Sequence, residues 1–343
     1  MANRDYAGIV DESMMIGSEK LLLTIGIPAE HQERPLDCSD VRILDLAVAN
    51  SWNGEKIGGQ LVKAREKVGH DFLYVTSDNA SIMKKGVRCA NMNQHRDISH
   101  SLGMYLERTY KNDPDFNHYL QSMAGSKAKH NMKAIAYLLP PAQRTIARFI
   151  NLSNWVRWSL KMLDAYHTLS SEEREVFAYI PAHASLIAEL SDVTKCVAAI
   201  EHLCKHQGLS GRTVRECQNA IRKYLSNGNL RMINLGASIA DFLRQELEQI
   251  DVKTTAVNNS SDIIESLFGK YKARKSPNKL YGITSHILFL PCYTELCNHL
   301  RAREFDFKAS LENTYLKDIQ VWSAQNLSPN LVRLRIKRLQ NAG

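Results

Sequence analysis

Short apolar segments separated by polar turns fill the first hundred residues of the chain. Their length and their β-branched residues are typical of strands, and the polar turn Gly17-Ser18-Glu19 between the first two segments predicts a hairpin. Apolar residues at helical spacing in 54–67 predict one helix within this series. The expected order is therefore strand, strand, strand, helix, strand. The predicted strands are 6–10, 21–25, 41–48 and 72–76.

Helical periodicity replaces this pattern from about residue 102 to about residue 249. Apolar residues recur every three or four positions, for example in 188–206, and β-branched runs typical of strands are almost absent. This pattern predicts helices packed on one another, and the lack of a fixed repeat argues against a solenoid. The polar stretch 258–261 then precedes a new helix that begins near Asp262 and carries Glu265 in its first turns.

These patterns predict an α/β protein with one interrupted domain. We expect residues 1–111 to form the first part of a mixed five-stranded sheet core and residues 258–343 to complete it. Residues 112–257 are expected to form a large all-helical insertion. The order of strands and helix, with one carboxylate on the first strand and another at the end of the fourth, is how an RNase H-like core begins.

Composition narrows the choice of partners and compartment. The 44 Lys and Arg against 36 Asp and Glu give a formal net charge of +8, which suits a polyanionic partner without requiring one. The seven cysteines form no C-x-x-C pair, so we expect reduced, buried thiols in a cytosolic protein. The start of the chain does not have the pattern of a signal peptide, and no apolar run is long enough to span a bilayer. We therefore expect a soluble, cytoplasmic protein without a membrane partner.

Three acidic residues stand where the predicted elements end or begin. Asp11 follows the first strand, Asp78 follows the fourth, and Glu265 lies in the helix after the insertion. Carboxylates from different elements can together hold two divalent ions about 4 Å apart, which stabilise the attacking and leaving oxygens in phosphodiester chemistry. Magnesium prefers such hard oxygen ligands. Acidic residues in this order also occur by chance, so their local contexts decide.

Short motifs surround these acidic residues and continue along nearly the whole chain. They are Val10-Asp11, Gly17-Ser-Glu-Lys-Leu-Leu22, Asn53-Gly-Glu55 with Gln60-Leu61, Ser77-Asp-Asn79, Asp97-Ile-Ser-His100, Leu139-Pro-Pro-Ala-Gln-Arg144, Ala147-Arg-Phe149, Asp262-Ile-Ile-Glu-Ser-Leu-Phe-Gly-Lys-Tyr-Lys272 and Gly282-Ile-Thr284. In these residues and in their order, the chain resembles a family of bacterial insertion-sequence transposases with a DDE catalytic domain.

The resemblance implies an RNase H-like fold with Asp11, Asp78 and Glu265 as metal ligands. The implied cofactor is Mg²⁺ or Mn²⁺, as two ions, and the implied partner is DNA, both transposon ends and target. It also implies a homodimer or larger assembly on DNA, acting at the bacterial nucleoid. Such transposases usually carry an N-terminal DNA-binding region, whereas ten residues precede Asp11 here. A separate N-terminal DNA-binding chain is therefore an expected partner.

Several further side chains are candidates for supporting roles. Asp97 and His100 are expected at the fifth strand or the helix after it, as a supporting ligand or general base, and a structural role is an equal alternative. Lys272 lies two helical turns beyond Glu265 on the same face. Some cut-and-paste transposases carry a DNA-contacting lysine at this offset. The Tyr and Arg that accompany it in that family are absent here.

The expected DNA contacts lie around the start of the helical block and on the Glu265 helix. Cations contact phosphates, and an aromatic ring can stack on a base drawn out of the duplex. For the two tryptophans, packing into the helical core is the favoured alternative, because they are three residues apart. The candidates are Lys127, Lys129, Arg144, Arg148, Trp155, Arg157, Trp158, Lys270 and Lys272.

Two other functions are alternatives. Another RNase H-like nuclease, such as an integrase or resolvase, would use the same carboxylates, but the long helical insertion before Glu265 favours the transposase. The alternative from a different class is a catalytically inactive or truncated transposase-derived DNA-binding protein. The intact acidic residues argue against it.

Overall fold

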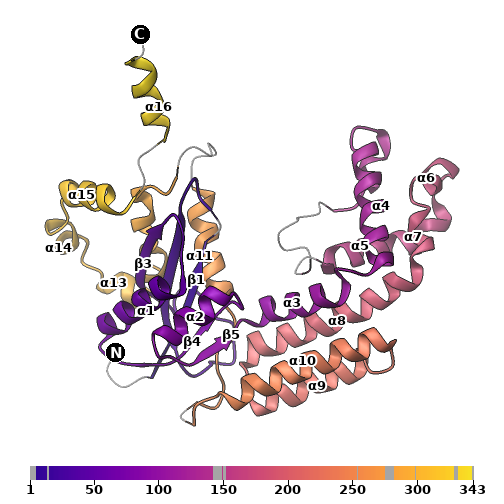
Figure 1. Cartoon of the computed structure of the whole chain (residues 1–343), viewed down its shortest axis with the longest axis horizontal. Coiled ribbons are helices and arrows are strands. Elements are labelled where there is room, and N and C mark those ends of the chain that lie inside the picture. Colours follow the sequence, from indigo (N-terminus) through magenta and orange to yellow (C-terminus); the bar gives the residue numbers. More distant parts are fainter. Residues whose placement is uncertain are drawn as a thin grey trace. The chain divides into compact units, whose positions relative to one another are not determined.

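The computed structural model divides the chain into two compact units (Figure 1). The α/β unit contains residues 1–97 and 249–343, and the helical unit contains residues 98–248. The residues that the structure describes are 5–13, 15–141, 149, 152–252, 254–274, 282–297, 299–327 and 331–341.

A five-stranded mixed sheet forms the centre of the α/β unit, with the strand order β3-β2-β1-β4-β5. The first three strands pair antiparallel, whereas β4 pairs parallel with β1 and β5 parallel with β4. The α/β class and the mixed five-stranded sheet expected from the sequence are confirmed. The strands are β1 (Tyr6–Glu12), β2 (Lys20–Pro28), β3 (Arg42–Ala49), β4 (Phe72–Ser77) and β5 (Gln94–Arg96).

Burial along the strands follows their positions in the sheet. In β2 the residues between Lys20 and Pro28 are all buried, because helices and loops cover both faces of this inner strand. Strand β3 lies at one edge of the sheet, and its residues are mostly half-buried. The continuous apolar run of β2 therefore reflects cover on two faces.

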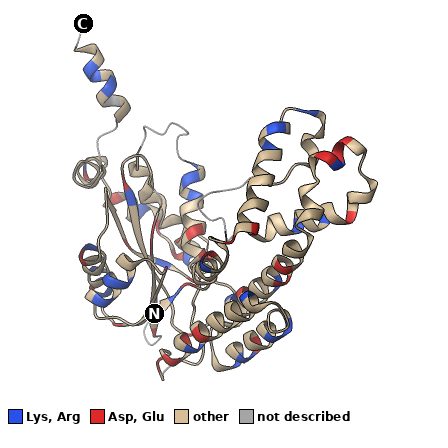
Figure 2. Cartoon of the chain, turned by 45° about the vertical axis from the view of Figure 1, so that its right-hand side comes forward, with Lys and Arg blue, Asp and Glu red and all other residues tan. Residues whose placement is uncertain are grey.

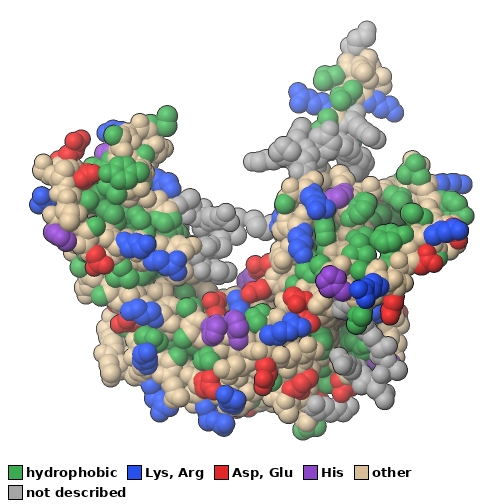
Figure 3. Space-filling view, turned by 180° about the vertical axis from the view of Figure 1, so that it is seen from behind, with side chains coloured by type: hydrophobic (Ala, Val, Ile, Leu, Met, Phe, Trp, Pro, Cys, Tyr) green, Lys and Arg blue, Asp and Glu red, His purple; other side chains and the backbone are tan. Residues whose placement is uncertain are grey.

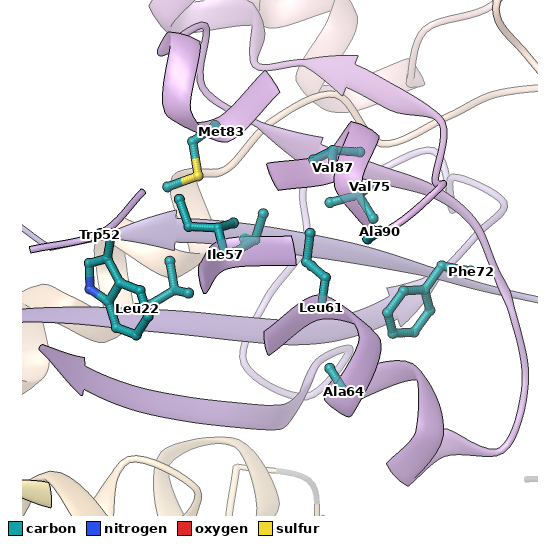
Figure 4. Close-up of a cluster of buried hydrophobic side chains, with 11 residues drawn as sticks. Leu22, Trp52, Ile57, Leu61, Ala64, Phe72, Val75, Met83, Val87 and Ala90 are labelled. Atoms are coloured by element: carbon teal, nitrogen blue, oxygen red, sulfur yellow. The ribbon is translucent and has the colours of Figure 1, made fainter. Parts of the chain in front are cut away.

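Helices α1 (Gly54–Val68) and α2 (Ser81–Cys89) cover one face of the sheet (Figure 4). The Asn53 side chain begins α1 by accepting a hydrogen bond of 2.9 Å from the Lys56 N–H, and Gly69 ends it with a left-handed φ of 74°. The buried cluster on this face comprises Val10, Leu22, Trp52, Ile57, Leu61, Ala64, Phe72, Val75, Met83, Val87 and Ala90.

Glycine residues allow α1 and α2 to approach each other closely. A Cβ atom added at Gly86 would lie 2.5 Å from Cγ2 of the buried Ile57, and one added at Gly58 would lie 2.8 Å from Cβ of Cys89. Both distances are shorter than carbon atoms tolerate without displacement. The contact between the two helices therefore depends on the missing side chains.

Helix α11 (Asp262–Ala273) also packs on the sheet and contacts β1 (Figure 1). One side of α11 is buried, as the apolar spacing in the sequence predicts. Ile9 of β1 alternates with Val10 and is also fully buried, so the face opposite to α1 and α2 is covered as well. The buried residues of α11 are Ile263, Ile264, Leu267, Phe268 and Tyr271.

Short helices follow α11 in the C-terminal part of the α/β unit. Helices α12 and α15 contact β3, and Arg301 donates hydrogen bonds of 2.8 and 3.4 Å to the carbonyl oxygens of Ser39 and Val41. Many apolar side chains between Leu288 and Leu339 are exposed on the surface (Figure 3). The elements are η3 (Ser285–Phe289), α12 (Cys292–Glu295), α13 (His299–Glu304), α14 (Phe307–Glu312), α15 (Leu316–Asn326) and α16 (Leu331–Gln340).

The helical unit is built around α8, which packs against α3, α5 and α9, while α10 packs against α3 and α9. Within the described residues, no helix is long and apolar enough to cross a membrane. The elements are α3 (Ile98–Tyr110), α4 (Pro114–His130), η1 (Ala134–Leu138), α5 (Leu152–Ala165), η2 (Tyr166–Thr168), α6 (Ser171–Val176), α7 (Tyr179–Ala182), α8 (Ala184–Gln207), α9 (Gly211–Tyr224) and α10 (Leu230–Glu248).

The predicted helical character of the insertion is confirmed, but its boundaries differ. The helical unit begins at residue 98 rather than 112, because α3 packs with α8 and α10. It ends at residue 248 rather than 257, because the chain then returns to the α/β unit, where Val257 forms a β-bridge with Glu30. Periodicity identifies helices, but it does not tell against which neighbours a helix packs.

We expect Gly86→Ala to lower the free energy of unfolding by about 1–3 kcal/mol, because the new methyl group overlaps Ile57. The matched control is Gly59→Ala in α1, where no atom lies within 4 Å of an added Cβ. This substitution should raise stability by up to about 1 kcal/mol through the higher helix propensity of alanine. Urea denaturation followed by circular dichroism measures both. Equal effects of the two substitutions would contradict the close helix contact.

Candidate functional site

Asp11 and Asp78 lie at the same end of two neighbouring strands. Asp11 is the penultimate residue of β1, and Asp78 directly follows β4. In the parallel ladder Ile9 pairs with Thr76. Continuing this register by two residues along each strand brings Asp11 level with Asp78. Since adjacent strands are about 4.8 Å apart, two half-buried carboxylates extend from neighbouring backbones at one edge of the sheet.

The loop that carries Asp78 is held by hydrogen bonds. Oδ1 of Asp78 accepts a bond of 3.0 Å from the N–H of Ala80, which forms a tight turn after the strand. The Gln94 amide of β5 donates bonds of 2.7 Å to Oγ of Ser77 and 3.3 Å to the carbonyl oxygen of Asp78. The backbone and one carboxylate oxygen of Asp78 thus have defined directions.

Glu265 lies in the N-terminal half of α11, on the helix that contacts β1. The helix is partly buried against the α/β unit, as predicted, whereas the Glu265 side chain is exposed. The side chain of Asp11 points to the face of β1 opposite to Val10, and this face is not the one that α1 and α2 cover. The elements of all three predicted metal ligands are therefore those expected from the sequence.

The structure places the three residues but does not show them as one metal-binding group. Among the residues that it describes, no three His, Cys, Asp or Glu side chains form a group that could hold a metal ion. Neighbouring carboxylates repel one another without a cation, and a glutamate side chain has three rotatable bonds. The convergence of Asp11, Asp78 and Glu265 stays a prediction.

Asp97 anchors the start of α11. It is fully buried, and its Oδ2 accepts hydrogen bonds of 2.7 Å from the N–H and 2.9 Å from the hydroxyl of Ser261. The N–H of Asp97 donates a bond of 2.8 Å to the carbonyl oxygen of Ser77 at the end of β4. Asp97 therefore connects the end of β4 with the beginning of the Glu265 helix. These contacts favour a positioning role over that of a general base.

Asn258, three residues before Ser261, provides a second set of anchors. The Tyr74 hydroxyl of β4 accepts a bond of 2.9 Å from the N–H of Asn258 and donates one of 2.7 Å to Ala29. The Thr76 hydroxyl donates a bond of 2.6 Å to the carbonyl oxygen of Asn258. Burial, the dominant cause, raises the pKa of Tyr74, so its hydroxyl stays protonated at neutral pH. The return of the chain from the helical unit is thus fixed to the sheet.

Asn259 was not identified from the sequence as a candidate. Its side chain is 1% exposed, and neither polar atom of its amide has a hydrogen-bond partner within the described part of the chain. Such buried, unsatisfied groups are uncommon in proteins. Asn259 lies between Asn258, which Thr76 anchors, and Ser261, which Asp97 anchors. The only signal in the sequence was a polar Asn-Asn-Ser-Ser run at a buried position.

The predicted DNA contacts of the helical unit have different exposures. Lys129 and Arg157 are exposed, and Lys127 is half-buried with its amine donating to the carbonyl oxygen of Pro140. Trp155 is 1% exposed, so its burial favours the packing alternative over base stacking. Trp158 and His100 are half-buried, and the Trp158 indole donates to the carbonyl oxygen of Leu138. The remaining two candidates, Arg144 and Arg148, lie outside the described residues.

The two lysines of α11 also differ from each other. Acidic residues occupy the first turn of this helix and basic residues its last turn (Figure 2). Lys272 is exposed, as a phosphate contact requires. Lys270 is half-buried, and its amine lies 2.7 Å from the sulfur of Cys38. Lys270 thus has a partner within the chain that the sequence did not indicate.

The functional argument for this chain rests on the motifs in its sequence and on the placement of its carboxylates. No protein-family model and no curated protein matches the chain. The pair of strand-end aspartates and the anchored helix that carries Glu265 are the features that a function has to explain.

We expect Asp97→Asn to lower the free energy of unfolding by about 1.5–3 kcal/mol, because a buried charged acceptor of two hydrogen bonds becomes neutral. Amide hydrogen exchange should accelerate in 258–265, where α11 begins. The matched control is Asp262→Asn, an exposed acidic residue in the same segment, which should leave exchange unchanged. Unchanged exchange in the Asp97 variant would contradict the anchoring role.

Proposed function

We propose that this chain is a DNA transposase of the DDE type, a nuclease and strand transferase with an RNase H-like core. The observation that carries the proposal is the placement of Asp11 and Asp78 level with each other on adjacent parallel strands. Glu265, from the helix that contacts β1, is the third carboxylate. The order of three antiparallel strands, a helix and a fourth strand agrees with an RNase H-like core. The sequence motifs around the same residues support the same family.

The donor set fits Mg²⁺ or Mn²⁺. All three side chains offer hard carboxylate oxygens, which these ions prefer over nitrogen or sulfur. Asp11, Asp78 and Glu265 would hold the metal, and the bound ions would supply charge stabilisation for the attacking and leaving oxygens of a DNA phosphodiester. The buried amide of Asn259, without a partner in the described residues, marks a place where a further polar group would be satisfied.

The chain's own residues supply position and charge for this reaction. The sheet fixes the backbone of Asp11, and the turn to Ala80 orients the carboxylate of Asp78. The Asp97–Ser261 contact sets where α11 begins and therefore where Glu265 lies. A water or a DNA 3′-hydroxyl held in line with the phosphate is the nucleophile of cleavage or strand transfer. Lys272, exposed two turns beyond Glu265, provides a cation for a DNA phosphate.

DNA and an assembly of more than one subunit are parts of this proposal. An integrase or another RNase H-like nuclease would use the same carboxylates. The helical unit between Asp97 and Glu265 favours the transposase, because in this family an inserted domain precedes the last carboxylate. A catalytically inactive DNA-binding relative is the alternative that loss of metal binding would favour.

We expect Asp11→Asn, Asp78→Asn and Glu265→Gln each to abolish metal-dependent DNA cleavage while folding is retained. An amide keeps the shape of the carboxylate but loses the charge that holds a hard cation. The affinity for Mn²⁺, measured by calorimetric titration of the whole chain, should fall at least about tenfold in each variant. Nicking of supercoiled plasmid DNA in Mn²⁺ gives the second readout.

Each variant has a matched control at a nearby acidic residue. These are Glu12→Gln beside Asp11, Asp71→Asn at the other end of β4 and Asp262→Asn in α11. The controls should bind Mn²⁺ as the unaltered chain does. Metal-dependent nicking that survives all three carboxylate substitutions would refute the mechanism, because the chemistry would then reside elsewhere.

A further inference from the structure

Two cysteines and a lysine form a cluster at the end of the sheet opposite to Asp11. Cys38 precedes β3, whose first residue Arg42 pairs with Gly26 of β2, and Gly26 in turn pairs with Gly8 near the start of β1. Lys270, in the C-terminal half of α11, brings its amine to 2.7 Å from the sulfur of Cys38. Neither the motifs nor the proposed function uses this cluster.

The charges around Cys38 favour a reactive thiol. The hydrogen bond to Cys38 is the main cause that raises the pKa of Lys270, so its amine stays an ammonium group. An ammonium beside a cysteine favours the thiolate, which is the nucleophilic form. The nearest acidic group, Asp37, opposes this effect, but its carboxylate already accepts two hydrogen bonds of 2.6 Å from Ser39. The cation in contact with the sulfur is therefore the stronger influence.

Cys297 is placed to react with Cys38 in a second step. It is exposed and lies within hydrogen-bonding reach of the Cys38 sulfur. Desolvation, followed by the neighbouring Cys38, raises the pKa of Cys297, so it is the protonated member of the pair at neutral pH. Arg301 ties the backbone of Ser39 and Val41 to α13, which keeps the two cysteine segments together.

The other cysteines have different surroundings. Cys196, Cys204 and Cys217 are buried in the helical unit, as the sequence predicted for all seven. Cys89 is exposed, and no contact with a lysine amine is among those that the structure shows for it. The expectation of buried thiols is wrong for Cys89 and Cys297, because they lie at surface positions of short helices and turns. Cys89 is thus an internal comparison for Cys38.

We propose that Cys38 and Cys297 are an oxidation-sensitive thiol pair, in which Lys270 activates Cys38 toward peroxides. The Cys38 thiolate attacks one peroxide oxygen, so that an S–O bond forms and the O–O bond breaks. The other oxygen leaves and takes a proton, as water or an alcohol. Cys297 then attacks the sulfenic sulfur of Cys38, an S–S bond forms, and the departing hydroxide leaves as water with the proton of Cys297. The two thiols lose two electrons and the peroxide gains them.

Oxidation changes the environment of α11. A disulfide sulfur carries no charge, so the Lys270 ammonium loses its ionic partner once Cys38 is oxidised. The new bond also links the loop before β3 covalently to the segment after α12. Disulfides in reducing compartments are usually transient and sensory, which agrees with an exposed, accessible pair. This chemistry is independent of the proposed function.

The test measures the reactivity of each cysteine in the full-length, reduced protein. Limited alkylation with iodoacetamide at one neutral pH, followed by peptide mass spectrometry, gives a rate for every cysteine. Cys38 should react about tenfold faster than Cys89, although Cys38 is less exposed. Lys270→Met should lower the rate at Cys38 to that of Cys89 or below, whereas Lys270→Arg, which keeps the charge, should retain most of it. Continued protection of Cys196, Cys204 and Cys217 shows that each variant is folded.

Stoichiometric hydrogen peroxide should produce a Cys38–Cys297 disulfide that dithiothreitol reverses. In Cys297→Ser, dimedone should instead trap a sulfenic acid at Cys38. A Cys38 rate no higher than that of Cys89, an unchanged rate in folded Lys270→Met, or peroxide that links other cysteines first would each overturn the proposal.

Discussion

Parallel pairing between β1 and β4 brings two acidic strand ends together across the centre of the sheet. Residues that are nearly seventy positions apart in the sequence become neighbours, because the ladder fixes the register of each strand against the other. A shift by one residue would turn Asp11 toward α1 and α2 and away from the side of Ile9. The burial of Val10 and Ile9 on opposite faces opposes such a shift. The hydrophobic cores on the two faces thus maintain the geometry of the candidate site.

The helical unit makes the position of α11 a separate problem. Residues 98–248 intervene before the chain returns to the sheet, and closing so long a segment has an entropic cost that local contacts have to offset. Hydrogen bonds from Tyr74 and Thr76 to Asn258, and from Ser261 to Asp97, provide these contacts. All lie at the buried end of the sheet, where hydrogen bonds compete little with water. They therefore position Glu265 without any need for it to be near Asp11 in the sequence.

Helix α11 has contacts of different chemistry at its two ends. Its first turn begins at the Asp97 anchor and carries the acidic residues, while its last turn carries the basic residues. This order suits the dipole of the helix, which favours negative charge at the N-terminus and positive charge at the C-terminus. Lys270 extends this end to the Cys38 cluster, whereas Lys272 remains exposed to solvent. One helix thus connects the candidate carboxylate site with the thiol pair.

The sequence by itself determined the strands, the first helix, the helical character of the insertion and the elements that carry Asp11, Asp78 and Glu265. Such features follow from the spacing of apolar residues and from local turn residues, which act over a few positions. Only the tertiary structure decided that α3 belongs to the helical unit, that Asp97 holds Ser261, that Trp155 is buried and that Lys270 contacts Cys38. Each of these contacts joins side chains distant in the sequence, so it depends on how whole elements pack, and no local pattern encodes that packing.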